Sequence, residues 1–246
     1  MSIRFSIFGK YPELIYDFSD KSDGSMKWFE DPELFRPNLE NRRNFFNKFL
    51  LHGDKIVTAG LVHGAKVQAV TDADTGSVIN NTDALITKTR DVFLSLTAAD
   101  CFPVYFYDPK KRDIGLAHAG WRGIVDGVIK NTVSGLEESF GSKPQDIIVG
   151  IGAGIRRCHF EILPDNSHFF KNHPDAIEIR NRKIFVDLPL IIKSDLISCG
   201  LQATSIEDSS LCTFCEERRY FSYRREKPKF VHAMIAYIGL GKQKLI

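Results

Sequence analysis

The sequence predicts an α+β fold in which a few helices cover a layered, largely antiparallel sheet system. Two observations lead to this prediction. Many short runs rich in Val, Ile, Phe and Tyr follow one another along the chain, and three longer segments carry apolar residues at helical spacing. Because 43% of the 246 residues are hydrophobic and no linker-like segment divides them, we expect a single domain over residues 1–246.

The expected strands are short runs in which β-branched and aromatic residues predominate, as is typical of a pleated, half-buried surface. The segment Asp108-Pro109-Lys110-Lys111 separates two of them and predicts a turn. We expect strands at residues 3–8, 55–62, 65–70, 84–87, 92–96, 104–107, 114–118, 146–151, 158–162, 183–187, 203–206 and 229–238.

Three segments have the apolar spacing of a helix. Residues 38–51 combine leucines and phenylalanines with polar residues between them, and residues 124–140 do the same with Gly141 as the expected C-terminal cap. Residues 188–198 form the third predicted helix, which Gly200 ends.

Composition and charge argue against several classes of protein. The formal net charge is only +2, from 33 basic and 31 acidic residues, so we expect no nucleic-acid partner. We expect neither a signal peptide nor a membrane span, because no apolar run approaches roughly 20 residues. Five cysteines without a secretory signal favour free thiols in a reducing, cytoplasmic location. The sequence does not indicate an oligomeric state.

The strongest functional signal comes from Cys101 and His118. Two strand-like runs joined by a turn lie between them, so a hairpin can bring both side chains to the same end. His63, followed by Gly64, adds a second imidazole. Two imidazoles and one thiolate suit a transition metal with an open coordination position. The same residues also suit a cysteine nucleophile with a histidine base, and the spacing alone leaves both uses open.

Several residues beside these motifs are candidates for substrate binding. Gly120 and Gly123 leave room for a ligand and precede a helix, where backbone N–H groups can face an anion. Trp121 is either core packing or a wall of the substrate pocket. Arg122 either pairs with a carboxylate or contacts the substrate.

Two further segments mix arginines with glycines or aromatics. Residues 150–157 are a glycine-rich turn that ends in Arg156 and Arg157, which is either an anion site or a solvated loop. Residues 220–225 are either the lining of a pocket that stacks a flat ring or a strand with one exposed face.

One Cys-x-x-Cys pair, formed by Cys212 and Cys215, raises the question of a metal or redox role. A structural zinc needs further ligands, and we find no second pair at suitable spacing. The βαβ pattern that accompanies a redox pair is also missing. We therefore expect neither role at these two cysteines.

The segments Ala99-Asp100-Cys101 and 118–123 resemble a bacterial family known as YfiH-like, polyphenol oxidase (laccase-domain) or peptidoglycan editing factor proteins. The resemblance extends over most of the chain. At one matching segment the chain departs from the family, because Arg156-Arg157 stands in place of Gly-Pro and His159 in place of a second Cys. The further matching segments are Asn41-Arg42 and residues 62–67, 83–87, 152–162, 212–213 and 221–225.

The resemblance implies a layered α/β/β/α sandwich similar to the catalytic domain of cytotoxic necrotising factor. It implies a zinc site, with copper as the alternative metal, whose ligands are His63, Cys101 and His118 and which is also the catalytic centre. The family and its human relatives are assigned phosphorolysis of adenosine, inosine, guanosine and methylthioadenosine, and also adenosine deamination.

Our first hypothesis is therefore a zinc-dependent purine nucleoside enzyme whose small-molecule partners are a purine nucleoside and phosphate. Arg42, Arg156 and Arg224 are candidates to hold the phosphate, because a guanidinium fork matches its oxygens. Trp121 and Tyr223 are candidates to stack the purine ring.

Three alternatives stay open. A metal-free cysteine hydrolase or amidase acting on peptidoglycan precursors would use Cys101 as nucleophile and His118 as base, with Asp100 or a backbone carbonyl orienting the base. A copper-dependent polyphenol oxidase would use the two histidines and the cysteine as a mononuclear copper site. A non-enzymatic binding module is disfavoured, because Cys, His, Arg and Gly gather at predicted strand ends.

Overall fold

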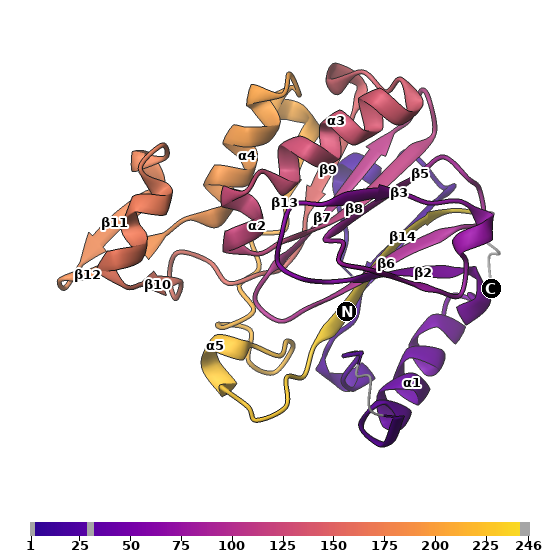
Figure 1. Ribbon diagram of the computed structural model, residues 1–246, viewed down its shortest axis with the longest axis horizontal. Coiled ribbons are helices and arrows are strands. Elements are labelled where there is room, and N and C mark those ends of the chain that lie inside the picture. The colour runs from indigo at the N-terminus through magenta and orange to yellow at the C-terminus, as the bar shows by residue number, and fades with distance from the viewer. Residues whose placement is uncertain (1–2, 29–31, 242–246) are drawn as a thin grey trace.

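The computed structural model describes residues 3–28 and 32–241, and two large sheets dominate it (Figure 1). The five-stranded sheet has the order β1 (Leu14–Phe18), β14 (Met234–Leu240), β6 (Phe93–Ala98), β2 (Ile56–Gly60) and β4 (Val78–Asn80). The six-stranded sheet has the order β13 (Ile206–Asp208), β9 (Ile148–Ile151), β7 (Phe102–Asp108), β8 (Asp113–Ala119), β5 (Ala84–Thr87) and β3 (Val67–Ala69).

The strand pairs of the two large sheets are mixed in direction, and each sheet has an antiparallel part and parallel pairs beside it. β7 pairs antiparallel with both β8 and β9, while β13 joins β9 in parallel. Parallel pairing also joins β2 to β4 and β6, and β3 to β5. The predicted largely antiparallel character therefore holds for the runs β1–β14–β6 and β9–β7–β8–β5, and the remaining pairs of the two large sheets are parallel.

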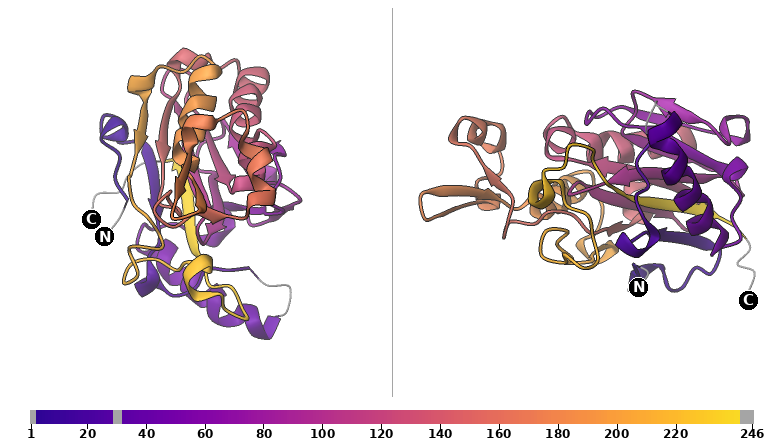
Figure 2. Two further views of the ribbon diagram at one scale, coloured as in Figure 1. Left: turned by 90° about the vertical axis from the view of Figure 1, so that its left-hand side faces the viewer. Right: turned by 90° about the horizontal axis from the view of Figure 1, so that it is seen from below.

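The two large sheets pack face to face, and helices cover their outer faces. Leu94, Tyr105 and Leu116 belong to the apolar core between the sheets. α3 (Val128–Phe140) and α4 (Leu188–Ser198) lie on the six-stranded sheet and share a second core with β7, β8 and β9. α1 (Pro32–Asn47) covers the five-stranded sheet (Figures 1 and 2). Its phenylalanines share a core with Phe93 and Tyr237.

A small third sheet projects from the side of the molecule, as the right-hand view of Figure 2 shows. Its strands follow the order β10 (Glu161–Ile162), β12 (Lys183–Val186) and β11 (Ile177–Arg180). Phe160, Phe170 and Val186 anchor this arm in the core under α3 and α4. Two further helices are short: α2 (Trp121–Val125) and α5 (Tyr223–Glu226).

The mixed α+β class is confirmed, and several predicted elements match closely. The predicted strand at residues 84–87 is β5, and the predicted third helix is α4 with the same bounds. The predicted turn at Asp108-Pro109-Lys110-Lys111 joins β7 to β8. None of the helices within residues 3–28 and 32–241 has the length and apolar character needed to span a membrane.

Other predictions of secondary structure were wrong for identifiable physical reasons. Residues 3–8 form no strand but end in a 3₁₀ turn (Ser6–Phe8), which lets Phe5 and Phe8 bury their rings on the same side. The predicted helix at 124–140 is interrupted at Gly127, whose φ of 90° is left-handed and separates α2 from α3. The predicted helix at 38–51 instead runs from Pro32 to Asn47.

The remaining differences concern short strands. Within residues 158–162 only Glu161 and Ile162 pair as a strand, because the preceding residues form a turn. Residues 203–205 form a 3₁₀ turn that leads into β13, and residues 220–225 contain α5 instead of a strand. β1, β4 and β11 were not predicted.

Candidate active site

Cys101 and His118 meet because they lie at the same end of the β7–β8 hairpin. Cys101 directly precedes β7, and the antiparallel register places Pro103 opposite His118. His63 approaches from the loop after β2, with its ring 4.9 Å from that of His118 and nearly perpendicular to it. The ligand atoms of the three side chains all lie within 4.8 Å of one another. We call these three residues the pocket cluster.

Asp83 holds both histidines of the pocket cluster in place. Its carboxylate accepts hydrogen bonds from the backbone N–H groups of His63 (2.9 Å) and Gly64 (2.8 Å), which fixes the loop where His63 has a left-handed φ of 61°. Its Oδ1 also lies 3.0 Å from Nδ1 of His118. Since Nδ1 is engaged, Nε2 of His118 is the nitrogen left for a metal or for the thiol. Asp83 was not among the predicted site residues, although its place directly before a buried strand was the available signal.

The electrostatics of the pocket cluster favour a charged cysteine–histidine pair when no metal is bound. Burial alone would raise the pKa of Cys101, but the neighbouring His118 and His63 lower it to about 6. Burial likewise opposes a charged His118, but Cys101 and Asp83 raise the pKa of its imidazole to about 9. The thiolate that a metal or a nucleophilic mechanism requires is therefore the form present near neutral pH.

The pocket cluster opens into a cavity of about 430 Å³. Lys27 lines this cavity, and the sequence analysis did not identify it; burial lowers the pKa of its ammonium group. Gly120 also lines it, and a Cβ at that position would lie 2.9 Å from Sγ of Cys101 and 3.4 Å from Cδ2 of His63. We expected the absence of a side chain at Gly120 to leave space for a ligand. The structure shows that this space is needed by the side chains of Cys101 and His63.

Four of the predicted substrate residues line this cavity. Trp121 packs against Phe169 of the projecting arm, with ring centroids 5.4 Å apart, and the guanidinium carbon of Arg122 lies 4.5 Å from the centre of the Trp121 ring. Tyr223 is 55% exposed at the rim. These cavity-lining residues are Trp121, Arg122, Tyr223 and Arg224.

The structure does not bring Arg42 or Arg156 to the lining of this cavity. Arg42 is a buried residue of α1 that donates hydrogen bonds to the Met26 carbonyl (3.0 Å) and to Oγ1 of Thr58 (2.9 Å), and it lines a different cavity. Arg156 makes a two-pronged ion pair with Asp208, at 2.8 and 2.9 Å. Both guanidinium groups are engaged in holding the fold.

Asp100 joins the wall of the cavity to two distant loops. It has a left-handed φ of 89°, and its carbonyl accepts from the backbone N–H of Ile155 at 2.7 Å. Its carboxylate accepts from Oγ1 of Thr213 and from the backbone N–H of Arg224, each at 2.7 Å. With both carboxylate oxygens occupied, Asp100 positions the segment that carries Cys101.

The donor set of the pocket cluster fits a transition metal. Two imidazoles and one thiolate offer three ligands, and the cavity leaves the remaining side accessible to a small molecule. Three protein ligands with an open fourth position are typical of catalytic zinc, and the same His₂Cys set occurs at mononuclear copper sites. The geometry therefore supports a catalytic metal and does not by itself choose between zinc and copper.

Comparisons with known proteins agree on one family. Residues 36–241 match the family described as multi-copper polyphenol oxidoreductase laccase. The purine nucleoside phosphorylase YlmD of Bacillus subtilis is 31% identical over 253 residues, covering 93% of this chain and 89% of the relative. The crystal structure of a hypothetical protein YfiH from Bacillus licheniformis superposes with a TM-score of 0.87 at 28% identity, and that of YlmD from Geobacillus stearothermophilus with 0.87 at 27%. Each superposition covers 94% of both chains.

Proposed function

The chain belongs to the family described as multi-copper polyphenol oxidoreductase laccase, and from this premise we propose that it is a zinc-dependent purine nucleoside phosphorylase. Its relatives in Bacillus subtilis and Geobacillus stearothermophilus carry the name purine nucleoside phosphorylase. The observation that carries the proposal is the pocket cluster, which leaves one side open to a cavity lined by aromatic and cationic side chains.

The proposed reaction is phosphorolysis of adenosine, inosine, guanosine or methylthioadenosine. A phosphate oxygen forms a bond to C1′ of the ribose while the bond from C1′ to the purine nitrogen breaks, and the base leaves with the electron pair and takes up a proton. Lys27, Arg122 and Arg224 supply positive charge along the cavity for the phosphate. Trp121 and Tyr223 offer flat faces on which the purine stacks.

The metal in this proposal is held by His63, Cys101 and His118. When bound, Zn²⁺ supplies a Lewis acid at the base of the cavity, and the same site is proposed to serve adenosine deamination. Asp83 fixes the tautomer of His118, and Asp100 keeps Cys101 in register with the two histidines. The ordered side chains thus hold three ligands in advance of substrate binding.

A second candidate function is supported by the electrostatics of the pocket cluster. With a pKa of about 6 for Cys101 and about 9 for His118, the metal-free chain has the charge state of a cysteine nucleophile with a histidine partner. In that proposal Cys101 attacks a carbonyl carbon of a peptidoglycan precursor, His118 protonates the leaving group, and Asp83 orients the imidazole. The likeness to the catalytic domain of cytotoxic necrotising factor that the family resemblance implies concerns the fold, and it stays a prediction.

One experiment separates these functions. The purified protein is incubated with adenosine and phosphate, and adenine, inosine and ribose 1-phosphate are quantified by chromatography before and after chelation of the metal. The matched variants are Cys101→Ser and Cys199→Ser, because Cys199 is a half-buried thiol far from the cavity lining. We expect ribose 1-phosphate to form with the wild type and with Cys199→Ser, and to be lost on chelation and in Cys101→Ser.

One outcome contradicts the proposed active site, and two others favour the alternative functions. Formation of ribose 1-phosphate at the wild-type rate by Cys101→Ser refutes a catalytic role for the pocket cluster. An absence of ribose 1-phosphate, combined with chelator-resistant hydrolysis of peptidoglycan precursors that alkylation of Cys101 abolishes, supports the cysteine hydrolase instead. Oxidation of phenols only after copper loading supports the polyphenol oxidase.

A further inference from the structure

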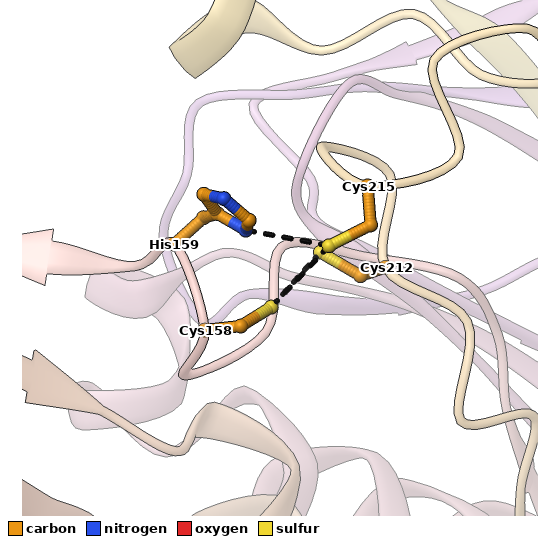
Figure 3. Close-up of side chains that lie close together, drawn as sticks. All are labelled: Cys158, His159, Cys212 and Cys215. Carbon is orange, nitrogen blue, oxygen red and sulfur yellow. Dashed lines mark hydrogen bonds between the residues drawn. The ribbon is translucent and has the colours of Figure 1, made fainter.

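A second group of metal-ligating side chains lies apart from the pocket cluster. Cys158 and His159 come from the turn between β9 and β10, and Cys212 and Cys215 come from the loop after β13. Figure 3 shows the four side chains pointing toward one another from these two loops, and all their ligand atoms lie within 4.8 Å of one another. We call these four residues the loop cluster. No partner pair for Cys212 and Cys215 is recognisable from spacing in the sequence, but the fold brings Cys158 and His159 beside them.

Parallel strand pairing explains why two distant loops meet here. β9 and β13 are parallel neighbours, with Val149 opposite Ile206, so the segments that follow them leave the sheet at the same edge. An isolated bridge then joins Gly154 to Cys212, and the backbone N–H of Thr213 donates to the Gly154 carbonyl at 3.1 Å. The two loops are therefore in fixed register immediately before they present their ligands.

The separations within the loop cluster match ligands that share one tetrahedral ion. Sγ of Cys158 lies 3.5 Å from Sγ of Cys212 and 3.6 Å from Sγ of Cys215, and Sγ of Cys215 lies 3.4 Å from Nδ1 of His159. Tetrahedral zinc, with its usual bond lengths, places two sulfurs about 3.8 Å apart and a sulfur and a nitrogen about 3.6 Å apart. A disulfide would require about 2.05 Å between the sulfurs, so these thiols are not paired covalently.

The surroundings orient the loop cluster. The His159 ring stacks on Phe214, with centroids 3.9 Å apart and planes 13° from parallel, which fixes the imidazole. The backbone N–H groups of Arg156, Cys215 and Phe214 hydrogen-bond to Sγ of Cys212, which holds this sulfur in place.

We propose that Cys158, His159, Cys212 and Cys215 bind a structural Zn²⁺ ion. Four protein ligands of the Cys₃His type fill a tetrahedral zinc and leave no position for a substrate. The ion would clamp two loops that both reach the active site, because Ile155 and Thr213 each hydrogen-bond to Asp100 at 2.7 Å. Its role is to hold the segment beside Cys101, and it takes no part in the reaction.

Cobalt substitution tests this proposal without relying on any enzymatic activity. Each Co²⁺–thiolate bond contributes to a charge-transfer absorption band, so a site with three thiolates absorbs about three times as strongly as a site with one. Apo protein is titrated with Co²⁺ under reducing conditions and then with Zn²⁺. The variants are Cys101→Ser, which keeps only the loop cluster intact, Cys215→Ser, and Cys199→Ser as a control remote from both clusters.

We expect Cys101→Ser and Cys199→Ser to give the strong band, and Zn²⁺ to displace it. We expect Cys215→Ser to lose most of the band intensity and to contain one fewer zinc ion per chain by elemental analysis. The result remains informative if Cys215→Ser fails to fold, because Cys101→Ser isolates the loop cluster in a chain that keeps all four of its ligands.

Two outcomes overturn the proposal. The first is a Cys101→Ser protein that binds no Co²⁺ and contains no zinc when purified under reducing conditions. The second is a Cys101→Ser protein whose Co²⁺ absorption band is no stronger than one thiolate gives, which would place the ion away from the three cysteines. Loss of nucleoside phosphorolysis plays no part in either outcome, so the two proposals fail independently.

Discussion

The pocket cluster and the loop cluster use the same two residue types in opposite proportions. The pocket cluster has two histidines and one cysteine at the base of a cavity of about 430 Å³, with Asp83 orienting one imidazole. The loop cluster has three cysteines and one histidine at the molecular surface, with Phe214 stacked on the imidazole. Three ligands beside a cavity leave a position for chemistry, whereas four ligands close the site. The number of ligands and the space beside them, more than the residue types, distinguish the proposed catalytic site from the proposed structural site.

The two clusters are mechanically linked through one residue. Asp100 directly precedes Cys101 and accepts hydrogen bonds from Ile155, Thr213 and Arg224. Ile155 and Thr213 lie close in sequence to the cysteines of the loop cluster. The comparison therefore predicts that damage at the pocket cluster affects chemistry directly, while damage at the loop cluster acts through stability and position.

The largest expected effect comes from removing one histidine from each cluster. His63→Ala removes a ligand of the proposed catalytic metal and should lower kcat/KM for phosphorolysis on the order of 1,000-fold, with Tm nearly unchanged. His159→Ala should keep kcat/KM within a few-fold and lower Tm by several degrees, because a structural ion stabilises the folded state. Steady-state kinetics and thermal melting measure both. If the two variants lose the same fraction of kcat/KM and the same number of degrees in Tm, the two clusters do not have different roles.

The next effect concerns the residue that orients the pocket cluster. Asp83→Asn weakens the charge-assisted contact to His118. We expect the metal affinity of the pocket cluster to fall about 10- to 100-fold. Competition with a chelator measures the affinity. Asp208→Asn is the matched control, since Asp208 pairs with Arg156 away from the cavity lining. A metal affinity in Asp83→Asn equal to that of the control would mean that Asp83 only shapes the loop.

A smaller effect is expected from filling the space beside the thiol. Gly120→Ala places a Cβ 2.9 Å from Sγ of Cys101, so the thiol must move by a few tenths of an ångström. We expect about a 10-fold loss of kcat/KM with little change in Tm, because small misplacements of catalytic groups are costly. Gly53→Ala is the control, because its Cβ would meet nothing within 4 Å. An unchanged kcat/KM in Gly120→Ala would show that the tight contact does not constrain the thiol.

The smallest effect is a pH dependence in the metal-free protein. The pKa of Cys101 is lowered to about 6, so the thiolate fraction rises as pH increases through that value. Alkylation of Cys101 by iodoacetamide should accelerate about five-fold between pH 5 and pH 6 and less than about two-fold above pH 6. Cys158, with its pKa raised to about 12, should continue to accelerate at higher pH. Mass spectrometry of each alkylated cysteine reports both rates, and acceleration of Cys101 that continues above pH 8 would contradict the lowered pKa.

The pocket cluster was accessible from the sequence because its geometry is local. Cys101 and His118 belong to one hairpin with a recognisable turn, and its antiparallel pairing brings them to the same end. His63 needed the family resemblance, since it arrives from another sheet. Asp83 was missed as an orienting residue because its role depends on the hydrogen bonds it receives after folding.

The loop cluster was not accessible from the sequence because it depends on a long-range strand pairing. Cys158 and Cys212 are 54 residues apart, and only the parallel alignment of β9 and β13 brings their loops together. The apolar periodicity also gave a wrong helix boundary, because it does not report the backbone conformation. The apolar pattern of residues 124–140 continues through Gly127, but the backbone there turns left-handed and ends one helix before the next begins.

The parallel pairing of β9 with β13 also has a consequence for how the chain folds. Contacts between segments that are distant in sequence form late, because the chain between them must first lose its freedom. The loop cluster cannot exist until that pairing is made, and the whole projecting arm and α4 lie within the closed segment. Binding of an ion by these four residues would therefore report a late step of folding, because the site forms only after β9 and β13 have paired.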